Sequence, residues 1–238
     1  MKDILVFDSL LSTNLYLQEN CIALPNKQIV IAKHQTAGRG RGANCWLDEE
    51  NTNLLISFLF KEEKDLFLSG LLSLVMGFSL HKTLRKYLAN EIKWPNDILV
   101  KTKKIAGILI DYKKQENINI FIVGMGVNVN QKNFDSSLQN KATSLYLELR
   151  KEIDLKVIQD ELIKNVFFEY EKLSMGSFDL SLYKKASFSL GKRILYHNKE
   201  YIIKDINSDG ALIIQNNKNC LLVNSGEITY FDLPNYYL

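Results

Sequence analysis

The sequence predicts an α+β fold, in which a mixed β-sheet flanked by helices is followed by a small C-terminal β-barrel. Hydrophobic, β-branched runs typical of buried strands alternate with long segments in which apolar residues recur at helical spacing. After Gly176 the pattern changes to short strand-like runs separated by turn residues, which is typical of a small barrel. We therefore expect two domains, at residues 1–188 and 189–238.

The strands of the first domain are expected where apolar runs of strand length are bounded by polar or turn residues. They lie at residues 3–7, 28–33, 53–60, 91–94, 98–100, 105–112 and 118–129. Helices are expected over residues 9–20, 65–88 and 155–173, the first with Ser12 or Thr13 as its N-cap. The barrel strands are expected at residues 193–196, 200–206, 211–215, 220–223 and 227–231.

The composition is that of a globular chain without a strong charge bias. Of the 238 residues 46% are hydrophobic, and 30 Lys and Arg against 27 Asp and Glu leave a formal charge of +3. This balance disfavours a protein that binds nucleic acid through bulk electrostatics. Cys21, Cys45 and Cys220 have neither metal-binding nor disulfide spacing, and the longest apolar run is shorter than the ~20 residues that cross a bilayer. We therefore expect a cytoplasmic protein that does not enter a membrane.

One loop stands out, at residues 37–46, where three glycines alternate with two arginines before Trp46. Glycine lets the backbone approach a ligand closely and adopt positive φ. Arg39 and Arg41 are two residues apart, so in an extended loop both guanidinium groups project to the same side. Such a loop suits a polyphosphate or a carboxylate, although alone it also fits a solvated turn or a contact to single-stranded nucleic acid.

A second stretch, at residues 93–97, reads Lys-Trp-Pro-Asn-Asp. Proline after a strand forces an extended approach and then a turn, so Asn96 and Asp97 should emerge at the strand end. A carboxylate there can hold Mg²⁺ or accept a hydroxyl or amine proton. Taken alone, the stretch is better explained as a turn between strands.

Two further stretches combine glycine with a polar side chain. Lys104 stands at the start of an apolar strand, in which Gly107 predicts a close neighbour to the backbone. Gly124, Gly126 and Asn128 repeat this pattern in a later strand. The functional interpretation is a lysine directed at a negative charge and an asparagine directed at polar ligand atoms, and the alternative for Lys104 is an exposed turn lysine.

In this order, the four stretches resemble the biotin–protein ligase family, also called biotin–[acetyl-CoA-carboxylase] ligases. The motifs that are similar are the family's glycine-arginine loop, Trp-Pro-Asn-Asp, Lys-x-x-Gly-[Ile/Leu]-Leu and Gly-x-Gly-x-Asn-Val, at residues 38–41, 94–97, 104–109 and 124–129. The resemblance runs from Ser9 to about Asn130, and more loosely through the C-terminal barrel. It implies a catalytic domain like those of class II aminoacyl-tRNA synthetases and biotin ligases at residues 1–188.

The resemblance implies a two-step reaction. The carboxylate of biotin attacks the α-phosphate of ATP, with Mg²⁺ as cofactor, and gives biotinyl-5'-AMP and pyrophosphate. The ε-amine of a lysine then attacks this adenylate and releases AMP. The expected acceptor is the biotin carboxyl carrier protein of acetyl-CoA carboxylase. In this family the glycine-arginine loop folds over the adenylate and shields it from water.

The resemblance also implies roles for single residues. Lys104, Arg39 and Asp97 are the expected catalytic residues, with Lys104 on the biotin carboxylate and the α-phosphate. Asp97 would position either Mg²⁺ or the incoming lysine amine, and both alternatives stay open. The expected biotin-binding residues are Ser12, Thr13, Asn14, Gln35, Gly38, Arg39, Arg41, Lys104 and Gly107. The expected ATP- and adenylate-binding residues are Arg39, Arg41, Trp46, Asn96, Lys104 and Asn128.

The sequence departs from the family at two points. The family's loop commonly continues as Gly-Arg-x-Trp, whereas Ala43, Asn44, Cys45 and Trp46 stand here, and we expect weaker ATP binding or a leakier adenylate. Some members carry an N-terminal winged-helix DNA-binding domain, but here the catalytic pattern starts within the first ten residues. We therefore expect no sequence-specific DNA binding.

Two other functions stay open as alternatives. A lipoate- or octanoate–protein ligase or transferase has the same general fold, but its members lack this glycine-arginine loop. An RNA-binding module could use the loop and the barrel, although the near-neutral charge disfavours it. Family members occur as monomers and as dimers through the sheet edge, so a homodimer is also an open alternative.

Overall fold

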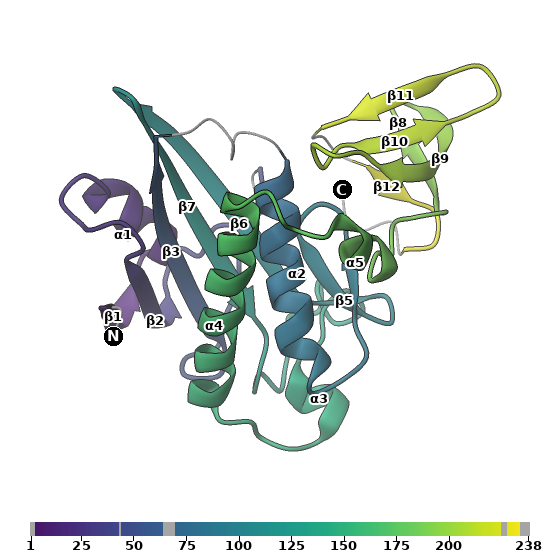
Figure 1. Ribbon diagram of the computed structural model, residues 1–238. Coiled ribbons are helices and arrows are strands. Elements are labelled where there is room, and N and C mark those ends of the chain that lie inside the picture. The colour runs from purple at the N-terminus through teal and green to yellow at the C-terminus, as the bar shows by residue number, and fades with distance from the viewer. Residues whose placement is uncertain (1–2, 43, 64–69, 225–227, 234–238) are drawn as a thin grey trace. The chain divides into compact units, whose positions relative to one another are not determined.

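The computed structural model describes residues 3–42, 44–63, 70–224 and 228–233 (Figure 1). The chain forms two compact units. The first combines residues 1–65 with 105–163, and the second combines residues 66–104 with 164–238. Both units are therefore discontinuous in sequence.

The sheet of the first unit is mixed, as the sequence predicts. Its strands follow one another in the order β1 (Ile4–Leu10), β2 (Ile29–Gln35), β3 (Leu54–Glu62), β7 (Ile118–Val127) and β6 (Lys103–Gln115). β1 and β2 run parallel, and the other neighbours run antiparallel. Residues 54–60 of β3 are buried throughout, as their continuous apolar run indicates.

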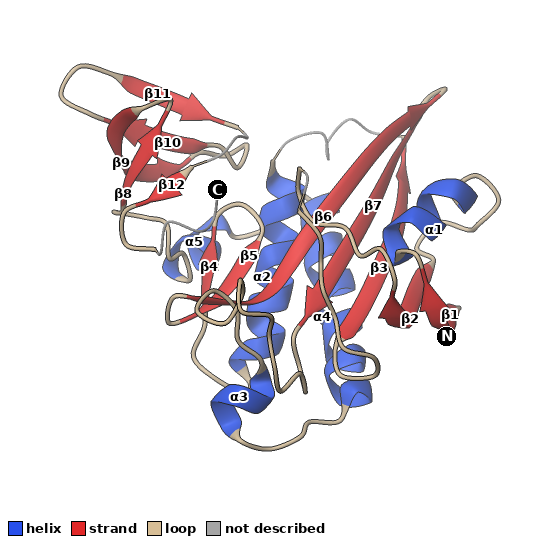
Figure 2. Ribbon diagram, turned by 180° about the vertical axis from the view of Figure 1, so that it is seen from behind, coloured by secondary structure: helices blue, strands red, loops and turns tan. Residues whose placement is uncertain are grey.

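Helix α1 (Thr13–Asn20) covers part of this sheet, against β2, β3 and β7. Figure 2 shows it from the side opposite to Figure 1. The contact is apolar, and its buried members are Leu17, Cys21, Val30, Leu59, Ile120 and Ile122. Burial of one such leucine stabilises the fold by about 1.5–3 kcal/mol, so this contact fixes where the first turn of α1 lies.

The helix predicted from residue 9 begins four residues later, at Thr13, and this part of the prediction was wrong. The reason is that β1 continues to Leu10. Ser9 and Leu10 pair with His34 and Gln35 of β2, and the ladder holds the chain extended. The same pairing brings Gln35 beside the start of α1.

The second unit contains a short hairpin packed on helices. β4 (Glu91–Lys93) pairs antiparallel with β5 (Asp97–Val100), and Lys93 is the register partner of Asp97. Helix α2 (Leu71–Arg85) packs on both strands and on α5 (Leu180–Lys185). The C-terminal part of α4 (Leu155–Ser174) bonds to α2 through a Lys82–Glu169 ion pair of 2.6 Å. The predicted start of α2 falls in residues 64–69, outside the described residues.

A second, antiparallel sheet forms at the C-terminus, where the sequence predicts a barrel. Its five strands lie in the order β11 (Cys220–Val223), β10 (Leu212–Gln215), β9 (Lys199–Ile206), β8 (Arg193–Tyr196) and β12 (Thr229–Tyr230). The compact unit that contains this sheet also includes residues 66–104. The division into domains at residues 188 and 189 stays a prediction.

Two short helices were not predicted, α3 (Leu145–Leu149) and α5. Each begins with a side-chain cap: Ser144 accepts a hydrogen bond from the backbone N–H of Leu147, and Asp179 accepts one from Ser181. Such caps are a readable signal, but helices this short show no periodic apolar pattern. Across the described ranges, none of the helices combines the length and the apolarity that spanning a bilayer requires.

Candidate active site

The glycine-arginine loop forms a small hairpin rather than an open loop. Arg39 and Cys45 form a β-bridge, and the N–H of Trp46 donates to the carbonyl of Gly38 at 3.0 Å. The turn lies at its tip, where Asn44 donates from both its N–H (3.2 Å) and its Nδ2 (3.1 Å) to the carbonyl of Arg41. Asn44 stands where the resemblance leads us to expect an arginine. In this chain its two hydrogen bonds to the Arg41 carbonyl close the turn. Ala43 lies outside the described residues, and a weaker hold on ATP stays a prediction.

Glycines allow this hairpin to lie close to the sheet. A Cβ on Gly38 would lie 2.3 Å from the carbonyl oxygen of Trp46, and one on Gly126 would lie 2.4 Å from its indole ring. The prediction that a close neighbour faces the glycines of β7 is thereby confirmed for Gly126. Gly107 is the register partner of Gly126 on β6, so these two glycines pair across the sheet near the indole.

Arg39 is held by Asp111, a residue that the sequence did not single out. The guanidinium donates to both carboxylate oxygens, Nη1 to Oδ2 at 3.3 Å and Nη2 to Oδ1 at 3.5 Å. The two side chains are 43% and 18% exposed, and such partly exposed pairs contribute only about 0–1 kcal/mol. Little free energy therefore opposes an exchange of Asp111 for another anion at Arg39.

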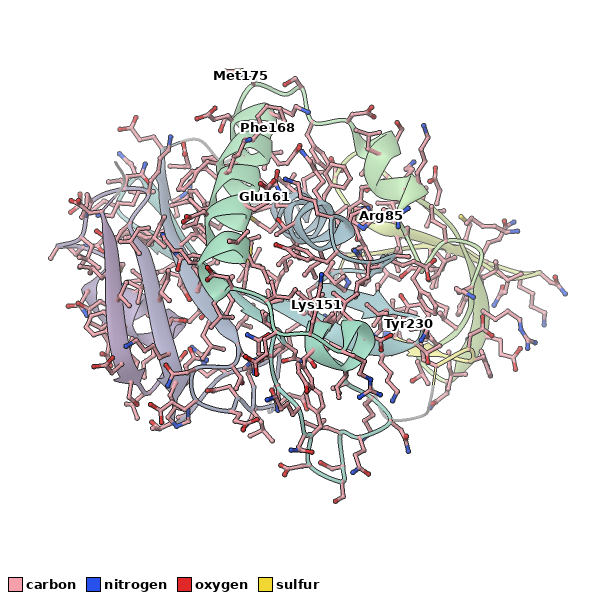
Figure 3. All side chains as sticks on the ribbon, turned by 90° about the horizontal axis from the view of Figure 1, so that it is seen from below. Arg85, Lys151, Glu161, Phe168, Met175 and Tyr230 are labelled. Atoms are coloured by element: carbon pink, nitrogen blue, oxygen red, sulfur yellow. The ribbon has the colours of Figure 1, made fainter. Side chains whose placement is uncertain are left out.

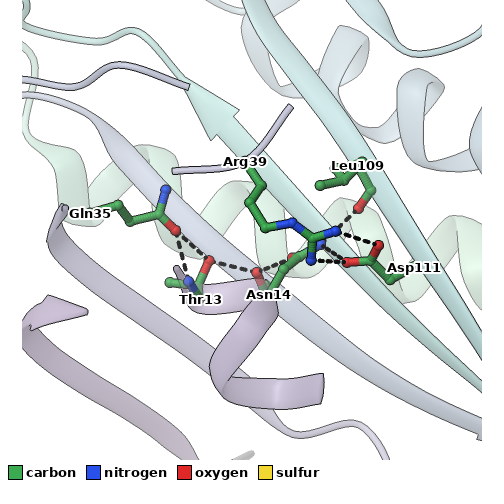
Figure 4. A network of polar contacts seen from close by, with 7 residues as sticks. Thr13, Asn14, Gln35, Arg39, Leu109 and Asp111 are labelled. Carbon is green, nitrogen blue, oxygen red and sulfur yellow. Dashed lines mark hydrogen bonds and ion pairs between the residues drawn. The ribbon is translucent and has the colours of Figure 1, made fainter. Parts of the chain in front are cut away.

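A polar network at the start of α1 joins the predicted biotin-binding residues (Figure 4). Gln35 Oε1 accepts from the N–H of Thr13 at 2.8 Å and from its Oγ1 at 3.0 Å. Asn14 Nδ2 donates to Asp111 Oδ2 at 3.0 Å and to the carbonyl of Leu109 at 3.3 Å. The structure thus brings Thr13, Asn14, Gln35 and Arg39 together within the first unit.

Ser57 completes this network from β3, and sequence reasoning missed it. Its Oγ lies 2.7 Å from Thr13 Oγ1 and 2.6 Å from Asn14 Oδ1, so its one hydroxyl proton can be directed to either oxygen. A Cβ on Gly124 would lie 2.1 Å from Asn14 Oδ1, so Gly124 makes the room for Asn14. The available signal was that Ser57 is the one hydroxyl in an otherwise apolar run. Ser12 stands at the N-cap position, but its side chain makes no capping hydrogen bond.

In the second unit, Asp97 is the centre of a buried charge cluster. Lys104 Nζ lies 2.7 Å from Asp97 Oδ1, and Lys93 Nζ lies 3.5 Å from Oδ2. The side chains of Asp97, Lys93 and Lys104 are 9%, 10% and 29% exposed. Burial alone would raise the pKa of Asp97, but the two ammonium groups outweigh burial and lower this pKa below its ordinary value. The aspartate is therefore ionised and paired. Lys104 is directed at the negative charge of Asp97, and its role toward a ligand stays a prediction.

The C-terminal segment fixes the turn that presents Asp97. Trp94 donates its N–H to Ser189 Oγ and its indole Nε1–H to the carbonyl of Gly210, both at 2.9 Å. Ser189 Oγ also bonds to the phenol oxygen of Tyr230 at 2.7 Å. Tyr230, labelled in Figure 3, comes from β12, and burial raises the pKa of its phenol, which keeps it neutral. The C-terminal sheet therefore supports the Trp-Pro-Asn-Asp motif from within the same unit.

The remaining predicted residues have structural contacts of their own. Asn128 is buried and donates from Nδ2 to the carbonyl of Thr143 at 3.0 Å, which holds the segment before α3. Asn96 lies half-buried in the turn between β4 and β5, beside Asp97. Arg41 is exposed in the hairpin turn. The roles of these three residues toward ATP stay predictions.

Comparison with known proteins assigns the chain to a family. The model of the biotin/lipoate A/B protein ligase family matches residues 6–128, which is more than half of the chain and includes Arg39, Asp97, Lys104 and Asn128. The chain belongs to this family.

The relatives that the chain resembles are named as biotin ligases. The bifunctional ligase/repressor BirA of Escherichia coli is 29% identical over 86% of this chain, and the biotin–[acetyl-CoA-carboxylase] ligase of Mycobacterium tuberculosis is 26% identical over 85%. Among solved structures, the biotin protein ligase of Aquifex aeolicus in complex with biotin and ATP superimposes with a TM-score of 0.84 at 26% identity. That superposition covers 97% of this chain and 99% of the Aquifex chain.

The lengths of the curated relatives differ from that of this chain. The alignments span 66% of the Escherichia coli protein, 46% of the Bacillus subtilis BirA and 78% of the Mycobacterium protein. The family assignment therefore concerns the part of these relatives that aligns with this chain.

The charge cluster predicts how Asp97 titrates. Because its folded pKa lies below the ordinary value of 3.8, its contribution to stability is present above that pH and is lost as the pH falls through the folded pKa. A ¹³C NMR titration of the Asp97 carboxyl, assigned with Asp97→Asn, should therefore have its midpoint below pH 3.8. Titration of this carboxyl between pH 5 and pH 7 would contradict the paired geometry.

Because Asn14 lies so close to Gly124, a methyl group added at Gly124 should lower the stability of the protein. The size of this loss should depend on whether Asn14 is present. Gly124→Ala forces Asn14 from its place and breaks its bonds to Ser57 and Asp111, which should destabilise the protein by about 1–3 kcal/mol in urea unfolding. In an Asn14→Ala background the added Cβ meets no amide, so the same substitution should cost clearly less. An equal cost in both backgrounds would show that Asn14 is not the obstacle.

Proposed function

We propose that this protein is a biotin–protein ligase, which forms biotinyl-5'-AMP from biotin and ATP and transfers biotin to a lysine of a carrier protein. The observation that supports this most is the Lys104 ammonium, held 2.7 Å from the buried carboxylate of Asp97. Both residues belong to motifs that this family shares, and the Aquifex relative binds biotin and ATP on the same fold.

In the first step, two anions must meet, since a carboxylate attacks a phosphate. Lys104 offers a fixed positive charge to the biotin carboxylate and to the charge that develops on the α-phosphate. Its counter-ion Asp97 keeps it oriented before ligand binds. Arg39 supplies a planar guanidinium suited to phosphate oxygens, and its partly exposed bond to Asp111 is readily exchanged for one to the ligand.

Recognition of the biotin ring system is assigned to the network at the start of α1. The ureido group of biotin is neutral and needs both donors and acceptors, because a buried polar group without a partner is costly. Thr13, Asn14 and Gln35 offer hydroxyl and amide groups of both kinds. All three are fixed by hydrogen bonds before ligand arrives, so little side-chain entropy is lost on binding.

The residues around Asp97 do not fit a protein-built Mg²⁺ site. Its carboxylate is already shared by two ammonium groups, and the described residues contain no cluster of three or more His, Cys, Asp or Glu side chains that could hold a metal ion. Mg²⁺ requires oxygen ligands in near-octahedral geometry and is commonly held through substrate phosphates. We therefore assign Asp97 to the orientation of Lys104 and of the incoming lysine amine, and Mg²⁺ stays a prediction tied to ATP.

The acceptor is proposed to be the biotin carboxyl carrier protein of acetyl-CoA carboxylase, in the cytoplasm. The support is the name of the Mycobacterium relative, a biotin–[acetyl-CoA-carboxylase] ligase. A homodimer and the absence of DNA binding stay predictions. The lipoate alternative is weaker, because the named relatives are biotin enzymes even though the family model covers both substrates.

The choice of substrate can be tested directly. The purified protein should catalyse exchange of labelled pyrophosphate into ATP in the presence of biotin, and mass spectrometry should detect biotinyl-5'-AMP. Lipoate and octanoate should give exchange at the level of the blank. Exchange that depends on lipoate or octanoate but not on biotin would replace the proposed function with its alternative.

Lys104→Ala should reduce this biotin-dependent exchange by about a hundredfold or more, as the loss of a donor to a developing anion does. The control is Lys113→Ala, which removes an exposed lysine from the same strand and should leave exchange unchanged. Full first-step activity in Lys104→Ala would remove Lys104 from the proposed chemistry.

A further inference from the structure

Lys93 is the second lysine at Asp97, and the sequence alone assigns it no role. Lys93 is the register partner of Asp97 in the β4–β5 hairpin, so its position is set by the backbone ladder. Its side chain is only 10% exposed, and lysine is rarely buried unless its charge is paired. Asp97 supplies that charge, with 3.5 Å between Lys93 Nζ and Oδ2.

The C-terminal sheet also holds Lys93 in place. Its Nζ lies 5.6 Å from the centre of the Tyr230 ring, within the range of a cation–π contact. The Tyr230 phenol is bonded through Ser189 Oγ to the backbone N–H of Trp94, the residue that follows Lys93. The ring, the hairpin and the ammonium are therefore parts of one bonded assembly within the second unit.

Lys93 affects how strongly Asp97 holds Lys104. The two ammonium groups bind different oxygens of one carboxylate, Lys104 on Oδ1 and Lys93 on Oδ2. At a buried site a charge pair at this distance is strong, and Lys104 must leave or share it when it binds an anionic ligand. A second cation on the carboxylate weakens its hold on the first.

We propose that Lys93 is a positioning residue, which takes up part of the charge of Asp97 and thereby keeps Lys104 available to an anionic ligand. The proposal rests on the proposed function in naming that ligand as the carboxylate of biotin and the α-phosphate of ATP. The charge sharing itself concerns only Lys93, Asp97 and Lys104 and is measurable without any ligand.

The kinetic test compares Lys93→Met, Lys93→Arg, Asp97→Asn and the double variant Lys93→Met/Asp97→Asn in biotin-dependent pyrophosphate exchange. Lys93→Met should lower kcat/KM for biotin by about tenfold, chiefly through KM, because ligand must now displace a tighter Asp97–Lys104 pair. Lys93→Arg should stay close to wild type. In the Asp97→Asn background the same Lys93→Met change should have almost no effect, since no carboxylate charge is left to share.

The matched control is Lys82→Met. Lys82 also shares a buried carboxylate with a second lysine, because Glu169 pairs with Lys82 at 2.6 Å and with Lys172 at 3.8 Å. This variant should lower thermal stability as much as Lys93→Met does, but it should leave KM for biotin unchanged. An equal rise of KM in both variants would show a general effect of a disturbed fold and would overturn the proposal.

A ligand-free measurement separates the proposal from the proposed function. The Asp97 carboxyl, followed by ¹³C NMR, should titrate at higher pH in Lys93→Met than in wild type. Unchanged titration would overturn charge sharing, as would a tenfold loss of kcat/KM from Lys93→Met that persists in the Asp97→Asn background. If wild type shows no biotin-dependent exchange while the carboxyl titration moves as expected, the proposed function fails and the charge sharing stands.

Discussion

The buried carboxylate of Asp97 is the group on which the proposed chemistry depends. An isolated carboxylate at this depth would lose too much hydration free energy to stay ionised. Pairing with the ammonium groups of Lys104 and Lys93 offsets that loss. In return the carboxylate orients Lys104, the residue that must meet an anion. The short β4–β5 hairpin provides the register for this arrangement, and Ser189 and Gly210 hold the hairpin through Trp94.

In the proposed function, the first unit recognises the neutral, hydrogen-bonding ring system of biotin. It does so with side chains that bond to one another in advance, around Thr13, Asn14 and Gln35. Their positions depend on the extension of β1 to Leu10, which brings Gln35 to α1, and on Gly124, which admits Asn14 to the sheet. Arg39 is held more weakly than these residues, as suits a group that must change partners when an anion binds.

Much of this could be predicted from the sequence, because glycine, proline and charged residues at strand ends have strong local meaning. The mixed sheet, the C-terminal antiparallel sheet and the family were predicted from such signals. The partners of Asn14 and Arg39 were not, since Ser57 and Asp111 reach them across 43 and 72 residues of sequence, which no local pattern reveals. The start of α1 was misplaced for the same reason: pairing with β2 keeps Ser9 and Leu10 extended where the local pattern favours a helix.

The central claim is that the Asp97-bound ammonium of Lys104 meets the activated acyl phosphate. Its most direct test is ¹⁵N NMR of the lysine ammonium groups, with Lys104 assigned by Lys104→Arg, before and after addition of a non-hydrolysable analogue of biotinyl-5'-AMP. We expect the Lys104 resonance to move on saturation, while that of the exposed Lys113 stays in place. Saturation by the analogue with no change at Lys104 would contradict the account.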